Sequence, residues 1–183
     1  MTHRTVVLKM VLSLDGFATS PDGTHDWMFR YFGDDGGWNQ RALDAAGTHA
    51  MGRRSYEIMG PHWQATEGPV ATAMNGTPKA VFSRTLERAD WGPVEVFRDV
   101  GAGIAELRSR PDAGTVLVHG GPTLASALTP LGLVDEYHLT RVPIAIGRGR
   151  SPFATLQEHL ALELVDEHRI PTGAVGQVLR PTR

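Results

Sequence analysis

Three short polar segments, each directly after a predicted strand, carry the most distinctive chemistry in the chain. They are Gly52-Arg53-Arg54-Ser55, Ser83-Arg84-Thr85 and Gly120-Gly121-Pro122-Thr123. Backbone N–H groups at the start of a helix suit an anion, and a glycine there lets the anion approach closely. The planar guanidinium group of arginine matches phosphate oxygens. Two such helix starts and three arginines suit a molecule with several separated phosphates, and NADPH, a dinucleotide with an extra 2′-phosphate, has that form.

Each segment also has an ordinary interpretation. Arg53 and Arg54 taken alone are a solvated surface pair, Gly120-Gly121 is a tight turn, and Ser83-Arg84-Thr85 is a polar strand end. Binding is favoured because the predicted order of elements places all three segments along one edge of a sheet. The chain has no complete G-x-G-x-x-G, no G-x-x-x-x-G-K-[ST] and no G-x-S-x-G, so other common nucleotide sites and the hydrolase nucleophile are not supported.

Length and composition favour one soluble globular domain over residues 1–183. Hydrophobic residues make up 41% of the chain and charged residues 21%, and the formal net charge is -2, so neither nucleic acid nor an anionic membrane is expected as a partner. Without cysteine there are no disulfides and no thiolate nucleophile or ligand, and the eight histidines lack metal-ligand spacing. No signal peptide and no run of 18 apolar residues is present, so we expect a cytoplasmic protein.

The apolar pattern predicts alternating strands and helices. Strands are expected at 5–12, 48–51, 79–82, 94–97, 115–119, 136–146, 160–170 and 174–179, and helices at 38–46, 54–59, 104–109 and 124–131. Gly47 and Gly60-Pro61 are expected to end the first two helices. Residues 16–37 read as a long aromatic loop, a kind that is usually functional. The order predicts an α/β protein with a mostly parallel sheet finished by an antiparallel hairpin, and ligands on such sheets bind beyond the carboxyl ends of strands.

Six segments together resemble the dihydrofolate-reductase-like superfamily. Within it, the resemblance is closer to the reductase domain of riboflavin biosynthesis (RibD C-terminal) and its free-standing relatives. The segments are VLSLDGFA at 11–18, PDGTHDW at 21–27, MGRRSYEIM at 51–59, VFSRT at 81–85, VHGGPTLASAL at 118–128 and DEYHLTRVPIAIGRGRSPF at 135–153. The resemblance implies a three-layer α/β fold: an eight-stranded, mostly parallel sheet with an antiparallel C-terminal hairpin and flanking helices.

The resemblance also implies an NADPH site and assigns positions to it. The motif that grips the pyrophosphate and 2′-phosphate matches Gly52, Arg53, Arg54 and Ser55, and the segment beside the adenosine ribose matches Ser83 and Arg84. The turn and helix start under the pyrophosphate and nicotinamide ribose match Gly120, Gly121, Pro122, Thr123 and Leu124. Backbone that meets the carboxamide matches Val11 and Leu12, and the loop that closes over the nicotinamide contains Asp15, Gly16 and Phe17.

On the substrate side the resemblance points to Asp15, Trp27 and Thr140. Trp27 either stacks on a flat heterocycle or pins the loop to the core. The proton comes from a bound water or from Asp26. The carboxylate that folate enzymes carry on their first helix has no clear counterpart, since Asp44 is expected to face solvent. A phosphate-binding set for a riboflavin precursor and the zinc signature of a fused deaminase are both missing.

These observations predict transfer of a hydride to a carbonyl or imine of a small, cyclic substrate, riboflavin-precursor-like or pterin-like. Two other classes stay open: a deazaflavin- or flavin-dependent reductase of the same fold, and a non-catalytic nucleotide-binding protein. Relatives often form homodimers, and an apolar strand at Val142–Ile146 is compatible with that or with an ordinary core. His119, before Gly120, is expected to be a plain strand-end residue.

Overall fold

One eight-stranded sheet forms the framework of the protein. The computed structural model describes residues 3–111 and 114–182, and its strands run in the order β4-β3-β2-β5-β1-β6-β8-β7. Neighbours from β4 to β6 are parallel, whereas β6 with β8 and β8 with β7 are antiparallel. The predicted sheet with its C-terminal hairpin is confirmed. The strands are β1 (Val6–Leu12), β2 (Ala46–Gly52), β3 (Lys79–Phe82), β4 (Val94–Phe97), β5 (Thr115–His119), β6 (Glu136–Arg141), β7 (Leu162–Arg169) and β8 (Val175–Pro181).

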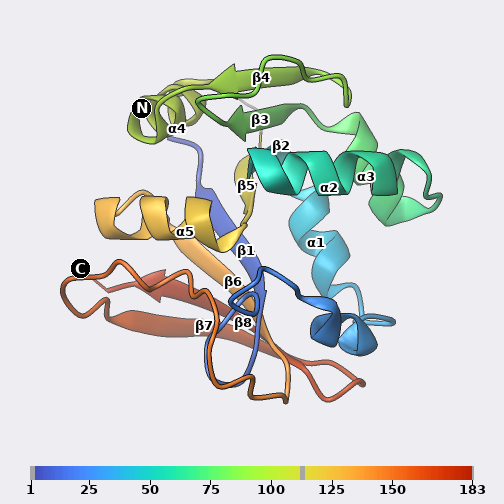
Figure 1. Cartoon of the computed structure of the whole chain (residues 1–183), viewed down its shortest axis with the longest axis vertical. Coiled ribbons are helices and arrows are strands. Elements are labelled where there is room, and N and C mark those ends of the chain that lie inside the picture. Colours follow the sequence, from blue (N-terminus) through green and yellow to red (C-terminus); the bar gives the residue numbers. More distant parts are fainter. Residues whose placement is uncertain (1–2, 112–113, 183) are drawn as a thin grey trace.

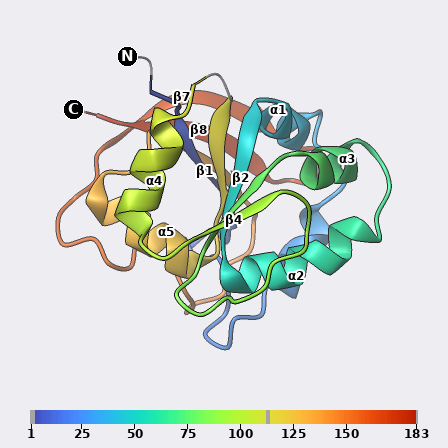
Figure 2. The same ribbon diagram turned by 90° about the horizontal axis from the view of Figure 1, so that it is seen from above.

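Helices cover both faces of this sheet, which makes three layers (Figures 1 and 2). One face carries α1 (Trp38–Asp44), α2 (Arg53–Gln64) and α3 (Pro69–Gly76), and the other carries α4 (Val100–Ser109) and α5 (Pro122–Leu128). Two short 3-10 helices, η1 (Asp26–Tyr31) and η2 (Thr129–Leu131), complete the set. No helix in the described ranges is long and apolar enough to cross a membrane.

The alternation of side chains along β1 divides the core between the two faces. Leu8 packs into the cluster shared with α4 and α5, whereas Val7 packs into the cluster shared with α1, α2 and α3. Because both faces of β1 are covered, its sequence is apolar at nearly every position. Lys9 is the exception, and it lies on the face of Val7.

Tertiary packing explains where the predicted helix ends were wrong. The second predicted helix was expected to stop at Gly60-Pro61, but α2 continues to Gln64 with Pro61 inside it. Tyr56 Oη accepts a 2.7 Å hydrogen bond from the backbone N–H of Trp91, and Gly60 packs against the Trp91 ring. This contact holds the helix in place past the residue that lacks an N–H. Gly47, expected to end α1, instead lies inside β2 beside a register shift.

The prediction that a strand continues through Val142–Ile146 is also wrong. Strand β6 ends at Arg141, and Pro143 cannot donate a ladder hydrogen bond. Val142 is buried in the core of the hairpin region, so this segment behaves as core and loop. Helix α3 and η1 were not predicted, because their sequences are short and rich in small or aromatic residues.

Trp38, the first residue of α1, lies flat on the C-terminal hairpin. A Cβ placed on Gly176 of β8 would sit 2.5 Å from the Trp38 ring, which stacks on His168 at an interplanar angle of 1°. The indole N–H of Trp38 donates a 3.1 Å hydrogen bond to the hydroxyl of Thr140. The absence of a side chain at Gly176 therefore lets α1 dock on the sheet.

We expect Gly176→Ala to lower the free energy of unfolding by about 1–3 kcal/mol, because the new methyl group overlaps the Trp38 ring. Urea denaturation of both proteins measures this change. Gly76→Ala is the matched control, since a Cβ at Gly76 of α3 meets no atom within 4 Å. Equal stability of the Gly176 variant and the parent protein would contradict the close packing of Trp38.

Candidate active site

Two helix starts lie side by side at the carboxyl edge of the sheet. Strands β2 and β5 are neighbours, with Met51 paired to His119, and each strand leads directly into a helix. A Cβ on Gly121 would lie 3.1 Å from the hydroxyl of Ser55, and one on Gly52 would lie 3.9 Å from Cβ of Leu124. The structure thus brings together two segments that lie almost 70 positions apart in the chain.

This pair of helix starts can accommodate an anion. Gly52 and Gly121 are the N-caps of α2 and α5, and neither helix is capped by a side-chain hydrogen bond. Several first-turn N–H groups are therefore left for another acceptor. A Cβ on Gly120 would lie 2.8 Å from Sδ of Met10, so a side chain there would displace Met10. Uncapped N–H groups beside glycines suit a pyrophosphate such as that of NADPH.

The three predicted arginines have different surroundings. Arg53 bonds to the carboxylate of Glu57 at 2.7 Å and to the hydroxyl of Thr85 at 2.9 Å, so it links α2 to the segment after β3. Arg54 packs its guanidinium group against Gly23 in the first loop. Arg84 is exposed and makes no hydrogen bond or ion pair with the described residues. Its charge is available to a ligand, whereas that of Arg53 is partly neutralised.

The turn after β3 has a local cause. Ser83 Oγ accepts hydrogen bonds from the backbone N–H groups of Thr85 at 3.2 Å and of Leu86 at 3.0 Å. The predicted contact residue Ser83 thereby fixes the loop that carries Arg84. Exposed Arg84 and half-buried Ser83 both lie at the carboxyl end of β3, next to the start of α2.

The loop after β1 is tied to the loop after β6. The Asp15 carboxylate accepts hydrogen bonds from the hydroxyl of Ser13 at 2.6 Å and from the backbone N–H of Gly147 at 2.7 Å. The Ser13 bond is the main reason that the pKa of Asp15 lies below its ordinary value. Gly16 has φ +85°, which glycine adopts readily, and Phe17 packs against Gly149. Asp15 thus joins the two loops.

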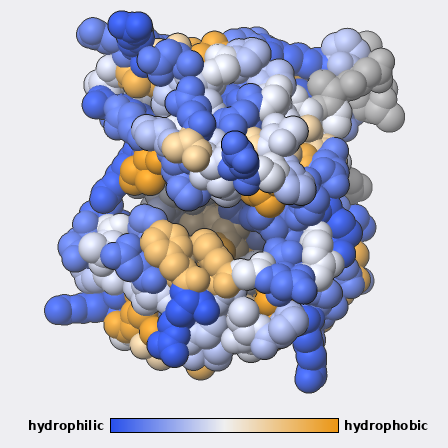
Figure 3. Space-filling model, turned by 90° about the vertical axis from the view of Figure 1, so that its right-hand side faces the viewer, coloured by the Kyte–Doolittle hydropathy of each residue, from blue (hydrophilic) through white to orange (hydrophobic). Residues whose placement is uncertain are grey.

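Three predicted residues gather around Trp38. Val11 is paired with Thr140 on β6, whose hydroxyl is bonded to Trp38, and half-buried Trp27 packs against the same cluster. The indole N–H of Trp27 is buried with no hydrogen-bond partner among the described residues. Asp26, by contrast, is exposed at the start of η1. Figure 3, which looks onto the face of α1, α2 and α3, shows a hollow in this face.

A lysine that the sequence analysis overlooked lies on the same face. Lys9 is paired with His119 on β5 and with His138 on β6. Its side chain is half-buried, and desolvation lowers its pKa to about 8, although the charge of Asp35 opposes this change. The sequence contained an indication of this lysine's special place, since Lys9 is the single charged residue in the otherwise apolar strand β1. An ammonium group that titrates near neutrality can act as an acid.

Two buried histidines lie next to Lys9. Nε2 of His119 is 3.0 Å from Nδ1 of His49, and Nε2 of His49 is 3.3 Å from the carbonyl oxygen of Ala73. Burial lowers the pKa of His49 to about 4 and that of His119 well below its ordinary value. Both rings are therefore neutral at pH 7. His119 is the last residue of β5, as expected, and it is also part of a buried polar chain.

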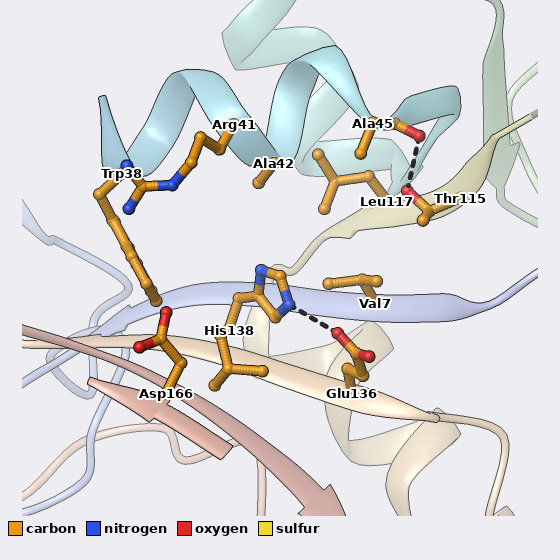
Figure 4. A pocket seen from close by; sticks show the side chains of 11 residues that line it. Val7, Trp38, Arg41, Ala42, Ala45, Thr115, Leu117, Glu136, His138 and Asp166 are labelled. Carbon is orange, nitrogen blue, oxygen red and sulfur yellow. Dashed lines mark hydrogen bonds and ion pairs between the residues drawn. The ribbon is translucent and has the colours of Figure 1, made fainter. Parts of the chain in front are cut away.

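A separate cavity of about 200 Å³ lies under α1, toward the amino ends of the strands (Figure 4). His138 projects into it and is bonded through Nε2 to the carboxylate of Glu136 at 2.9 Å. Arg180 holds the other oxygen of Glu136. Asp44 lies outside this cavity and bonds to Gln40 at 2.7 Å, at the exposed surface as predicted.

Comparison with known proteins agrees with this architecture. The model of the RibD C-terminal domain matches residues 4–175. An uncharacterized protein of Bacillus subtilis, YyaP, is 26% identical over 180 residues, which are 96% of this chain and 94% of that protein. The riboflavin biosynthesis protein RibD of Corynebacterium ammoniagenes is 30% identical over 166 residues, which are 81% of this chain but only 46% of that protein.

Solved structures show the same fold. A putative riboflavin biosynthesis protein from Shewanella sp. PV-4 superposes with a TM-score of 0.78 at 20% identity, covering 98% of this chain and 99% of that one. A pyrimidine reductase-like protein from Corynebacterium diphtheriae gives a TM-score of 0.70 at 16% identity, covering 98% and 92%. With a family model that matches nearly its whole length, the chain belongs to the RibD C-terminal domain family, within the dihydrofolate-reductase-like fold.

Proposed function

We propose that the protein is an NADPH-dependent reductase that transfers a hydride to a carbonyl or imine carbon of a small heterocyclic substrate. The observation that carries this proposal is the pair of uncapped helix starts at Gly52 and Gly121, joined at the carboxyl edge of the sheet. Family membership supports it, because the RibD family points to a reductase. When bound, NADPH supplies the hydride.

The proposed cofactor site follows this edge. Gly52, Ser55 and Gly121 would receive the pyrophosphate, with Gly120, Pro122, Thr123 and Leu124 forming the adjoining turn and helix start. Arg54 and Arg84 would contact the 2′-phosphate, and Arg53 would position the Ser83–Thr85 loop through its bond to Thr85. At the other end, the backbone of Val11 and Leu12 would receive the carboxamide, beneath the loop that contains Asp15, Gly16 and Phe17.

The substrate would bind on the side of Trp38. Trp27 offers a flat apolar surface and an unbonded indole N–H, and exposed Phe29 and Phe32 of the η1 region extend the aromatic surface. Thr140 is already bonded to Trp38 and would form the floor. A flat heterocycle with an acceptor for the Trp27 N–H fits these groups, as pterins and riboflavin precursors do.

The proton donor in this proposal is Lys9. Hydride addition leaves negative charge on the carbonyl oxygen or imine nitrogen, and that atom takes up a proton. Lys9 Nζ holds a proton at neutral pH and, with its lowered pKa, releases it more readily than an ordinary lysine. Asp26, the donor proposed from the sequence, is exposed to water on η1 and is the competing assignment.

Two other functions make different binding predictions. A deazaflavin-dependent enzyme of this fold would bind that cofactor through the same helix starts, and a non-catalytic nucleotide-binding protein would bind NADPH without oxidising it. Calorimetric titration with NADPH, NADH and a deazaflavin, followed by a substrate screen that monitors NADPH oxidation, separates the three. Gel filtration with light scattering tests the proposed homodimer.

We expect the double variant Arg54→Ala/Arg84→Ala to bind NADPH at least about tenfold more weakly, because charge-assisted hydrogen bonds contribute about 1.5–3 kcal/mol each. NADH affinity should change little, since NADH lacks the 2′-phosphate. Calorimetry measures both affinities. Arg169→Ala, an exposed arginine on β7, is the control. An equal loss for both cofactors would contradict the 2′-phosphate contact.

We expect Lys9→Met to lower kcat by about 10²-fold or more, the typical contribution of a general acid, with the KM for NADPH unchanged. In the parent protein kcat should fall above pH 8, because Lys9, with its pKa of about 8, loses its proton there. Asp26→Asn should retain kcat and this pH profile. The opposite result, a loss on Asp26→Asn alone, would assign the proton to Asp26.

A further inference from the structure

A buried hydrogen-bond chain lies beneath the proposed site and has no part in the function described so far. It runs from the carbonyl oxygen of Ala73 through His49 to His119. His49 is fully buried, so water does not replace its partners, whereas His119 is 8% exposed. The polar atoms of the His49 ring must therefore be satisfied within the protein.

The chain fixes the position of each ring proton. A carbonyl oxygen only accepts hydrogen bonds, so Nε2 of His49 carries a hydrogen. Because burial keeps His49 neutral, its Nδ1 is an acceptor, and Nε2 of His119 must donate to it. His119 is neutral as well, which leaves its Nδ1 without a hydrogen. No hydrogen bond to this Nδ1 is present within the described residues.

The neighbouring position holds a group that only donates. Lys9 is directly paired with His119 in the parallel ladder, and both lie on the face of Val7 and Leu117. The three N–H donors of its ammonium group make no hydrogen bond to the described residues. After burial, the charge of Lys9 is among the causes that hold the pKa of both His119 and His49 low. The amine of Lys9 therefore acts electrostatically on both histidine rings.

We propose that His119 is a positioning residue: Nδ1 of His119, kept free of hydrogen by His49, is the acceptor for Lys9, whose amine makes no hydrogen bond with the described residues in this structure, and the bond formed there aims the amine at the substrate atom that takes the proton. This inference rests on the proposed function, in which Lys9 is the donor. His49 acts through His119 and contacts neither ligand. A protonated or reversed His119 would turn an N–H toward the ammonium group and repel it.

Other titratable groups also face Lys9, and the test must separate them. His138 flanks it on β6, but its Nε2 is bonded to Glu136 and its ring projects into the cavity under α1. Asp35, before α1, raises the pKa of Lys9, while its Oδ2 accepts from the backbone N–H of Asn39 at 3.0 Å. Neither residue depends on the tautomer of His119.

The first test needs neither substrate nor cofactor. In the ¹⁵N-histidine NMR spectrum of the full chain we expect His119 and His49 to be neutral, each with a protonated Nε2 and a bare Nδ1. The ¹³Cε signal of Lys9 then reports its titration in the parent protein and in variants. His119→Leu should lower the pKa of Lys9 by about one unit, since a hydrogen bond that stabilises the ammonium form is lost.

Rescue and control variants separate positioning from packing. His119→Gln, which retains an acceptor and a donor, should restore the Lys9 titration. His49→Leu frees the His119 tautomer and should shift Lys9 in the same direction as His119→Leu, so the proposal can be decided even if one variant does not fold. His159→Gln, in an exposed loop, should leave the Lys9 titration unchanged. In turnover, the alkaline limb of the kcat profile should follow the Lys9 pKa in each variant, with the KM for NADPH unchanged.

A hydrogen on Nδ1 of His119, or a Lys9 titration unaffected by His119→Leu and His49→Leu, would overturn the proposal. These outcomes are distinct from failure of the proposed function. If Lys9 shifts as expected while NADPH does not bind, the hydrogen bond stands and the reductase assignment fails. If NADPH is oxidised while Lys9 does not respond, the assignment stands and His119 has no positioning role.

Discussion

The register of β1 against β5 and β6 is the constraint on which the rest of the site depends. Side chains alternate between the faces of a strand, so a slip of one residue would turn Lys9 toward α4 and α5 and bury Leu8 on the wrong side. In the observed register Lys9, His119 and His138 form one row on the face of α1 and α2. The apolar residues that fill both halves of the core thereby also determine where the polar groups lie.

Parallel pairing of β2 with β5 has a second consequence at the carboxyl edge. Each strand ends in a glycine-led turn and enters a helix, so adjacent strands give adjacent helix starts. A Cβ built on Gly52, Gly120 or Gly121 would lie within 4 Å of atoms of a neighbouring element, which shows how closely these elements approach one another. At Gly120 that Cβ would collide with Met10. In the proposed function, backbone packing at this edge would hold the pyrophosphate, and the arginines would add selectivity for the 2′-phosphate.

Local patterns in the sequence predicted much of this architecture. Strands β3, β4 and β5 have the predicted bounds, because each is a short apolar run between polar turns. The helix end at Gly60-Pro61 could not be predicted, since the Tyr56–Trp91 contact that extends α2 joins distant segments. The same holds for His49 and His119, 70 positions apart. Motifs indicated the edge of the sheet at which we propose the cofactor site, but only the register brought Lys9 and the histidines together.

Two lysines with the same pKa shift differ in the contacts that they make. Burial lowers the pKa of both Lys9 and Lys79 to about 8. Lys79 donates a 2.8 Å hydrogen bond to the carbonyl oxygen of Asn75 and lies 4.7 Å from the centre of the Trp91 ring, so its charge is compensated inside the core. Lys9 is half-buried, makes no hydrogen bond with the described residues, and is paired in the ladder with His119, whose Nδ1 has no partner among those residues either. The same shift therefore accompanies a structural role in Lys79, whereas Lys9 retains donors that a ligand can accept from, which is why Lys9 is the proton donor in the proposed function.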